Sequence, residues 1–241
     1  MLLNYIPIAK AMPEYSKRDG KPYVCSLGYD YSKGFIRVYP TPLAGLITWT
    51  PICFKAEKNK RDPRPVSWKM PEDCRHGEWS VKSLKVTYKK PLNQSAKTTI
   101  MREMLDNSVN AISELNKRRE SIGFLLVNSY KIEGVPNGKY IDTTQIGMFE
   151  DVELAGFTKF TKDLRETEFR IRFRDGDGDH NVAFNRWDIY ETARKYSVKQ
   201  ALDSFNKTGQ HILMLGNYLQ HQTSWCVLGI FPVPNQLQLF K

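Results

Sequence analysis

The chain has 241 residues, of which 36 are Lys or Arg and 26 are Asp or Glu, so that its formal net charge is +10. Its apolar content of 41% is ordinary for a globular protein. No apolar run approaches the roughly 20 residues that a membrane span requires, and the N-terminal stretch MLLNYIPIAKAM is too polar for a signal peptide. We therefore expect a cytoplasmic protein with no membrane partner.

The positive charge is concentrated in the first half of the chain. Residues 1–120 contain 22 basic and 12 acidic residues, whereas residues 121–241 contain 14 of each. Such an asymmetry indicates a surface that faces a polyanion. The alternative is a lysine-rich surface that only keeps the protein in solution.

The first predicted elements form a β-hairpin. The apolar, β-prone run YVCSLGY at Tyr23–Tyr29 is followed by turn residues at 30–34 and by a second strand, FIRVYP, at Phe35–Pro40. Because side chains alternate along a strand, Arg37 and Tyr39 are expected on the same face. We predict that Arg37 contacts a nucleic-acid phosphate and that Tyr39 stacks on a base.

A strand predicted at Ile47–Lys58 leads into the basic loop KNKRDPRPVSWK at Lys58–Lys69, and a further strand is predicted at Ser80–Lys90. Pro63 and Pro65 exclude a helix from the loop and favour an extended, exposed path. Cations beside an aromatic ring on such a loop suit contact with a nucleic-acid strand. The candidate contacts here are Lys58, Lys60, Arg61, Arg64 and Trp68. The alternative is an exposed linker of ordinary charge.

The clearest helical pattern covers residues 95–119, where Ile100, Met104 and Ile112 recur near the helical period. Further helices are predicted near Asn185 and over Val198–Phe205, with β-rich composition around them. We expect a β-rich α+β fold with one long helix between two β-rich halves. The predicted division is a basic β-rich module at 1–92, a connecting helix at 93–120 and an α+β module at 121–241, or else one continuous domain. No internal repeat is visible.

The stretch FRIRFRDGDGDH begins with a strand that carries alternating arginines. On a strand, Arg170, Arg172 and Arg174 share one face, and the apolar residues between them share the other. The guanidinium groups would lie about 7 Å apart, close to the phosphate spacing of a single nucleic-acid strand. We predict phosphate contacts for all three arginines. The alternative is a charged, solvent-facing surface paired with carboxylates of a neighbouring strand.

The end of the same stretch alternates Asp175, Asp177 and Asp179 with glycine and closes with His180. A calcium loop of the EF-hand type would need glycine where His180 stands and a glutamate where Arg186 stands. Catalytic carboxylates are usually fixed on rigid elements, whereas alternating Asp and Gly is typical of a turn. We predict a hairpin turn with no metal and no cofactor, and keep a metal-dependent nuclease as the alternative.

Other catalytic patterns are missing from the sequence. It contains no GxxxxGK[ST], GxGxxG, HExxH or GxSxG motif. No nucleophile and base stand out as a pair, and an enzyme is therefore not expected.

Three segments together resemble an uncharacterised group of bacterial and phage proteins. YVCSLGYDYSKGFIRVYPTP resembles the group's TVCxAG…GxWIRLYP pattern, and KNKRDPRPVSWK resembles its DPRPES stretch. The closing LGNYLQHQTSWCVLGIFPVP resembles its G…WxIIGxFYPP motif. The order and spacing agree over most of the chain, although each motif alone is of low specificity.

The cysteine-containing first motif is also similar to proteins with dual OB domains, which implies OB-like β-barrel modules of the kind that bind oligonucleotides. The group carries cysteines around the turn before a helix that here opens with Arg186. In this chain the turn is formed by residues 175–179 and has no cysteine. No zinc site is therefore carried over.

These observations favour a non-enzymatic protein that binds RNA or DNA. The resemblance to bacterial and phage proteins implies a component of a larger nucleoprotein or of a phage–host conflict system. One alternative is the nuclease that uses the loop at 175–179. Another is an adaptor or inhibitor whose basic face binds an acidic protein partner.

Overall fold

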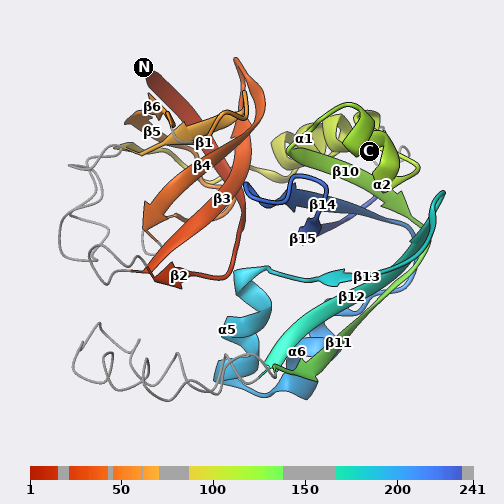
Figure 1. The fold of residues 1–241 in the computed structure, drawn as a ribbon. Helices are drawn as coiled ribbons and strands as arrows, with labels where there is room; N and C mark the ends of the chain where they lie inside the picture. Colours follow the sequence, from red (N-terminus) through yellow and green to blue (C-terminus); the bar gives the residue numbers. More distant parts are fainter. Residues whose placement is uncertain (16–21, 43–45, 61, 71–86, 138–166, 235–241) are drawn as a thin grey trace.

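The computed structural model describes residues 1–15, 22–42, 46–60, 62–70, 87–137 and 167–234. It is β-rich with few helices, and its strands curl into two barrels, one from each half of the chain (Figure 1). Arg61 and most of the strand predicted at Ser80–Lys90 lie outside the described residues. No helix in the described ranges combines the length and the apolar composition that crossing a bilayer would require.

The first barrel is a ring of hydrogen-bonded strands. Its strands are β1 (Leu2–Lys10), β3 (Pro22–Asp30), β4 (Gly34–Pro42), β5 (Ile52–Lys55), β6 (Glu57–Lys58) and β7 (Ser67–Lys69), with β2 (Glu14–Tyr15) and β8 (Thr87–Tyr88) attached. Strand β3 pairs antiparallel with β1 and β4, β4 pairs parallel with β7, and β7 pairs antiparallel with β6. The predicted hairpin of β3 and β4 is confirmed.

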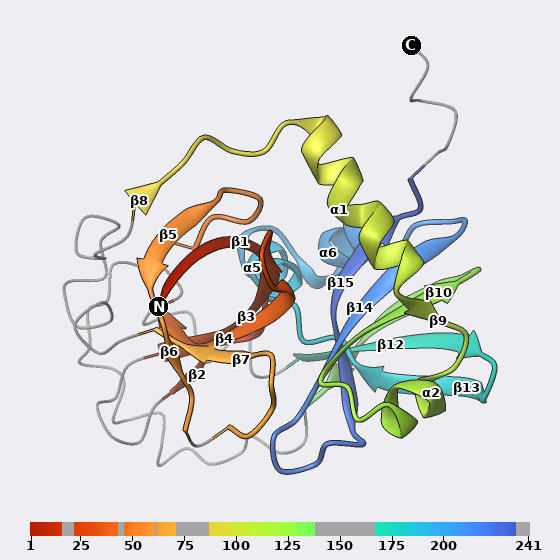
Figure 2. The ribbon, with the colours of Figure 1, turned by 90° about the horizontal axis from the view of Figure 1, so that it is seen from above.

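The ring closes because β5 and β6 act as one strand with two partners. Only Ala56 separates them, and β5 pairs with β1 while β6 pairs with β7. The Ala56 backbone N–H donates to the Met1 carbonyl at 2.6 Å, which continues the β1 pairing to the end of the strand. Viewed end-on, β1, β3, β4, β5 and β7 surround a common centre (Figure 2).

The second barrel repeats this pairing. Its strands are β10 (Ile122–Val127), β11 (Tyr130–Pro136), β12 (Thr167–Asp175), β13 (Gly178–Ala183), β14 (His211–Asn217) and β15 (Trp225–Pro232). Strands β10 and β11 are separated by two residues, and pair with β14 and β12 respectively. Strand β12 pairs with β13, and Phe184, directly after β13, pairs parallel with Val227 of β15. The pairing of β14 with β15 closes the ring.

The two rings have the same connectivity, although the sequence shows no repeat. If the strands of each ring are numbered along the chain, the fourth lies beside the first, and the third pairs parallel with the fifth. In the first barrel the continuous segment β5–β6 is the fourth strand, and in the second barrel β10–β11 is the first. The spatial order 4-1-2-3 is a Greek key.

Strands at the junction of the barrels are buried on both faces. Along β14, Leu213 and Leu215 face the interior of the second barrel, while Ile212 and Met214 join a cluster that also contains Ile6 and Ile8 of β1. Fully burying an aliphatic side chain contributes about 1.5–3 kcal/mol. We call this cluster, which contains Ile6, Ile8, Ile212 and Met214, the inter-barrel core. Its burial holds the two barrels together.

The segment at 95–119 differs from the single helix predicted for it. It forms α1 (Gln94–Asp106), β9 (Ser108–Val109) and α2 (Ile112–Lys117), and β9 pairs parallel with β10. The side chains of Asn107 and Ser108 donate hydrogen bonds to the Glu103 and Leu105 carbonyls, at 2.7 Å each. Short polar side chains of this kind compete with helical hydrogen bonds, and they end α1 here.

The other helices agree with the sequence pattern. The helix predicted near Asn185 is α5 (Trp187–Lys195), and the next one is α6 (Val198–Phe205), as predicted. Along the chain, both helices come between β13 and β14, the third and fourth strands of the second barrel. The tail contains β14 and β15, the predicted strand, turn and strand.

Gly28 of β3 provides a test of the barrel packing. A Cβ atom at this position would lie 2.2 Å from the Ile6 carbonyl oxygen and 2.4 Å from the Tyr5 ring. Because backbone and a buried ring must both shift, Gly28→Ala should lower the free energy of unfolding by about 1–3 kcal/mol. Chemical denaturation measures this change, and an unchanged midpoint would show that the barrel is packed more loosely than described.

Candidate nucleic-acid interface

A cleft of about 1500 Å³ lies between the two barrels. It is formed mainly by β4, by the loop between β6 and β7 (residues 59–66) and by the loop between β14 and β15 (residues 218–224). The structure brings most of the predicted N-terminal site residues together here: Arg37, Tyr39, Lys58, Lys60, Arg64 and Trp68 line the cleft. Tyr39 and Arg37 share this face of β4, as alternation along the strand predicts.

The charge of the cleft is predominantly positive. Its lining includes five basic side chains and two acidic ones, Glu57 and Asp62. Lys69 pairs with Glu57 at 3.3 Å, and Arg64 pairs with Asp62 at 2.6 Å. Lys58 and Lys60 add positive charge beyond these ion pairs, and both are exposed. The cleft therefore offers positive charge to an anionic ligand.

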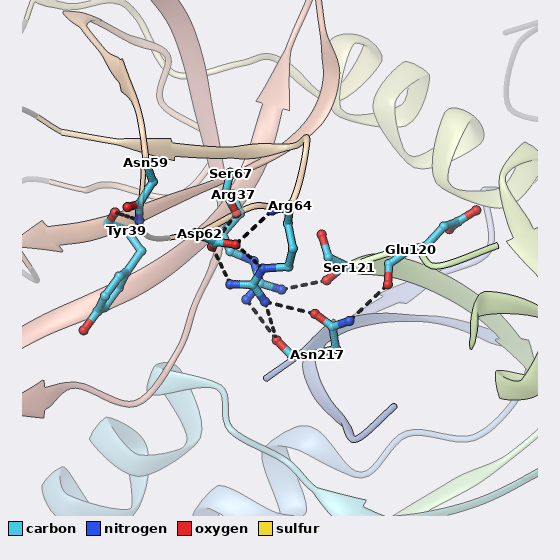
Figure 3. A network of polar contacts seen from close by, with 9 residues as sticks. All are labelled: Arg37, Tyr39, Asn59, Asp62, Arg64, Ser67, Glu120, Ser121 and Asn217. Carbon is cyan, nitrogen blue, oxygen red and sulfur yellow. Dashed lines mark hydrogen bonds and ion pairs between the residues drawn. The ribbon is translucent and has the colours of Figure 1, made fainter. Parts of the chain in front are cut away.

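Arg37 is buried, in contrast to the exposed phosphate contact predicted for it. The residue is 5% exposed, and its two terminal nitrogens donate to the carbonyls of Asn217 at 3.0 Å and Ser121 at 2.6 Å (Figure 3). Asn217 is the last residue of β14 in the second barrel, and Ser121 directly precedes β10, the first segment of that barrel. The strand pattern indicated which residues share a face with Arg37, but it could not indicate that the second barrel covers that face.

Arg64 connects the basic loop to the end of β14, directly before the second loop of the cleft (Figure 3). Its Nε and Nη2 atoms donate to the two carboxylate oxygens of Asp62, at 2.7 and 2.6 Å. Its Nη1 atom donates to both the backbone and the side-chain oxygen of Asn217, at 3.0 Å each. Only 9% of the Arg64 side chain is exposed. Most of its hydrogen-bonding capacity is therefore used within the protein.

Asp62 is the anionic centre of this contact. Burial opposes its ionisation, but hydrogen bonds from Arg64 and Ser67 outweigh the burial and lower the pKa of the carboxyl group. The Ser67 hydroxyl donates to it at 2.7 Å. Asp62 therefore stays ionised and fixes the Arg64 guanidinium in place.

Trp68 lines the cleft but is only 8% exposed. The Lys58 ammonium lies 4.0 Å from the centroid of its ring and also donates a hydrogen bond to the Pro65 carbonyl. A base could stack on this face of Trp68 only after Lys58 moved. Tyr39 and Lys60 remain more accessible than Trp68 at the same cleft.

The opposite wall of the cleft was not predicted from the sequence. Tyr218, Leu219, Gln220 and His221 line it, and Tyr218 and Leu219 are among the exposed large hydrophobic residues. A signal was present, because an adjacent tyrosine and leucine open an otherwise polar turn. The turn and the basic loop are far apart in the sequence. Only the fold, in which the turn between β14 and β15 lies at the same cleft as β4, shows that they belong to one site.

The arginines of β12 do not line the cleft. Arg172 lies 3.0 Å from Glu133 of the neighbouring strand, and Arg170 lies 2.8 Å from Glu168. Arg174, at 78% exposure, lies 4.0 Å from Asp179. The three side chains thus form a ladder of ion pairs on a solvent-facing sheet. The pairs of Arg172 and Arg174 with neighbouring strands match the alternative raised for this strand, whereas Glu168 lies on β12 itself.

The acidic turn caps a helix. The Asp175 carboxylate accepts the Ile112 backbone N–H at 3.0 Å, and the Asp177 carboxylate accepts the Ser113 N–H at 2.7 Å and its hydroxyl at 2.8 Å. Ala111, at the start of α2, makes no capping bond of its own. The hairpin turn of β12 and β13 therefore supplies the acceptors that the first turn of α2 needs.

The same turn brings potential metal ligands together. The ligand atoms of Asp175, Asp177 and His180 lie within 4.8 Å of one another. Asp175 Oδ1, however, contacts His180 Nε2 and accepts the Asp177 N–H, at 2.7 Å each. The capping bonds occupy the other carboxylate oxygens. These bonds give the acidic residues a structural role in capping α2.

Comparisons with known proteins do not assign a family. No protein-family model and no curated protein matches the chain. Among solved structures, the tetrameric p202 HIN2 is similar with a TM-score of 0.30 and 11% identity, over 94% of this chain and 88% of that chain. A replication protein A heterotrimer bound to ssDNA is similar with a TM-score of 0.22 and 9% identity, over 96% of this chain and 65% of that chain. Scores this low do not establish a common fold.

The ionised state of Asp62 predicts a pH dependence of stability. Because its pKa is lowered on folding, the carboxylate stabilises the protein above the unfolded pKa of about 3.8, and this contribution is lost as the pH falls through the folded value. The difference in unfolding free energy between wild type and Asp62→Asn should therefore shrink as the pH falls below about 5. Denaturation at several pH values measures it, with Asp203→Asn on α6 as the control.

The capping role of the acidic turn predicts a loss of stability on substitution. The Asp175 side chain is 0% exposed, so that Asp175→Ala leaves the Ile112 N–H without its acceptor. The free energy of unfolding should fall by about 1–3 kcal/mol. Asp179→Ala, with a largely exposed side chain, should have little effect. If Mg²⁺ or Mn²⁺ raised the Tm of the wild type but not of Asp175→Ala, the turn would instead hold a metal.

Proposed function

We propose that the protein binds nucleic acid, without catalysis, in the cleft between its barrels. The observation that carries this proposal is the meeting of a basic loop, a strand face and a second loop at one cleft of about 1500 Å³. Pockets for drug-sized ligands are smaller, roughly 300–1000 Å³. The size suits several units of a polymer, and the positive lining suits a polyanion.

The strand order supports an OB-like assignment of both barrels. The OB fold is a five-stranded Greek-key barrel that binds oligonucleotides or oligosaccharides across its second and third strands and through the loops between strands 1–2 and 4–5. In the first barrel, these strands are β3 and β4, and the loop between strands 4 and 5 is residues 59–66. The cleft lies at this position, and its charge favours oligonucleotides over neutral sugars.

Lys58 and Lys60 are the phosphate contacts that we propose. Both are exposed, and both belong to the segment that forms the rim of the cleft. Arg37 and Arg64 contribute to the positive potential, while their hydrogen bonds to Asn217 keep the cleft in shape. The ladder of ion pairs on β12 is a less favourable site because a phosphate would compete there with carboxylates.

The proposed role in a larger nucleoprotein or a phage–host conflict system rests on the sequence resemblance. The adaptor alternative uses the same basic cleft for an acidic protein. The two differ in one respect: a protein partner would still be captured after nuclease treatment, whereas a partner bound through nucleic acid would be lost.

The proposal predicts salt-dependent binding that requires the two lysines. A suitable probe is a fluorescent single-stranded oligonucleotide of about 20 nucleotides, because one OB fold contacts roughly 4–16 nucleotides. Its affinity should fall as salt rises, and Lys58→Ala/Lys60→Ala should weaken binding and make the slope of log K against log salt shallower by about 1.4, or 0.7 for each lost phosphate contact. Fluorescence anisotropy measures both quantities.

Two further double variants make the experiment specific. Lys199→Ala/Lys207→Ala removes the same charge from exposed positions outside the cleft and should change affinity little. Arg172→Ala/Arg174→Ala tests the β12 face. If the β12 variant lost binding while the lysine variant kept it, the site would lie on β12. If no oligonucleotide bound even at low salt, nucleic-acid binding would be refuted.

A further inference from the structure

The loop at 218–224 presents apolar side chains to the cleft. Tyr218 and Leu219 are 39% and 40% exposed, and both line the cleft across from the basic loop. The remaining residues of the loop, from Gln220 to Ser224, are polar. Covering apolar surface is favourable by roughly 25 cal/mol per Å². A ligand with flat apolar faces would therefore gain by lying against Tyr218 and Leu219.

Hydrogen bonds within this loop and from the preceding Asn217 support its conformation. The Ser224 N–H donates to the His221 carbonyl at 2.9 Å, and the His221 and Tyr218 N–H groups donate to the Tyr218 and Ser224 carbonyls at 3.3 Å each. The Asn217 side chain donates to the carbonyls of Glu120 and Gln222, at 3.1 and 2.8 Å. A preorganised wall loses little conformational entropy when a ligand binds.

The apolar wall is also fixed relative to the basic wall. Arg64 belongs to the basic loop of the first barrel, and its bonds to Asn217 hold the residue that immediately precedes Tyr218 (Figure 3). Arg64 is thus a positioning residue for the opposite wall. The site is composite, since neither barrel alone contains both walls.

The two walls differ in chemistry in a way that fits an unpaired nucleic-acid strand. Lys58 and Lys60 offer ammonium groups to phosphates, while Tyr218 and Leu219 offer surface to the faces of bases. In a duplex the base faces are stacked on one another and are not available to such a wall, whereas in a single strand they are.

We propose that the cleft takes single-stranded nucleic acid, with its phosphates against Lys58 and Lys60 of the first barrel and its bases against Tyr218 and Leu219 of the second. This inference rests on the proposed function and adds the strandedness of the ligand and the side of the cleft that receives the bases. It also assigns the second barrel a direct part in binding.

The two walls should respond differently to substitution. Loss of base stacking typically weakens binding about 5- to 150-fold per base. Tyr218→Ala/Leu219→Ala should therefore lower the affinity for a single strand by at least about 5-fold. The salt slope should stay unchanged because no phosphate contact is lost. The lysine variant should instead change the slope.

The test compares labelled single-stranded oligo(dT) and oligo(U) with a duplex of equal length, by fluorescence anisotropy at several salt concentrations. Tyr218→Phe keeps the ring and should retain most of the affinity. Tyr196→Ala, at a tyrosine exposed outside the cleft, is the matched control and should bind as the wild type does. Circular dichroism checks folding, and if the double variant does not fold, Leu219→Ser alone carries the test.

The outcomes separate the two proposals. Tighter binding of either single strand than of the duplex, lost in Tyr218→Ala/Leu219→Ala, supports the inference. If binding required Lys58 and Lys60 but tolerated loss of Tyr218 and Leu219, or if the duplex bound as tightly, the inference would be wrong and the proposed function would stand. If no oligonucleotide of either kind bound, the proposed function itself would fail.

Discussion

The guanidinium of Arg37, buried between the two barrels, is the contact on which the arrangement of the cleft depends. It joins β4 of the first barrel to the Ser121 carbonyl before β10 and to the Asn217 carbonyl at the end of β14. Gly216 makes room for it, since a Cβ atom there would lie 3.2 Å from Arg37 Nη2. A buried cation is tolerated only with such hydrogen bonds. The position of the loop after β14 therefore follows from the position of β4.

Much of the local structure could be predicted from the sequence. The hairpin of β3 and β4, the absence of helix from the described part of the basic loop and the helix Val198–Phe205 follow from alternation, proline and turn residues and helical spacing. These are properties of segments of about ten residues, where local preferences and one buried face act together. The loop lysines were likewise predicted at a surface, and they line the cleft.

What could not be predicted depends on contacts between distant segments. The alternation in β4 could not show that a second barrel covers Arg37, nor could the aspartates at 175 and 177 be connected with a helix start more than sixty residues earlier. The arginines of β12 have the spacing of a phosphate-binding stripe, but carboxylates on the same strand and on the neighbouring strands meet them. A charge pattern on one strand does not reveal its partners across the sheet.

The burial of the junction strands on both faces has a consequence for how the chain unfolds. Strands β1, β10 and β14 contribute one row of side chains to a barrel interior and the other row to the inter-barrel core. Separating the barrels would expose the second row to water, while opening one barrel would remove the surface on which the other packs. The two halves should therefore lose structure in one cooperative transition, as a single folding unit despite the repeated strand order.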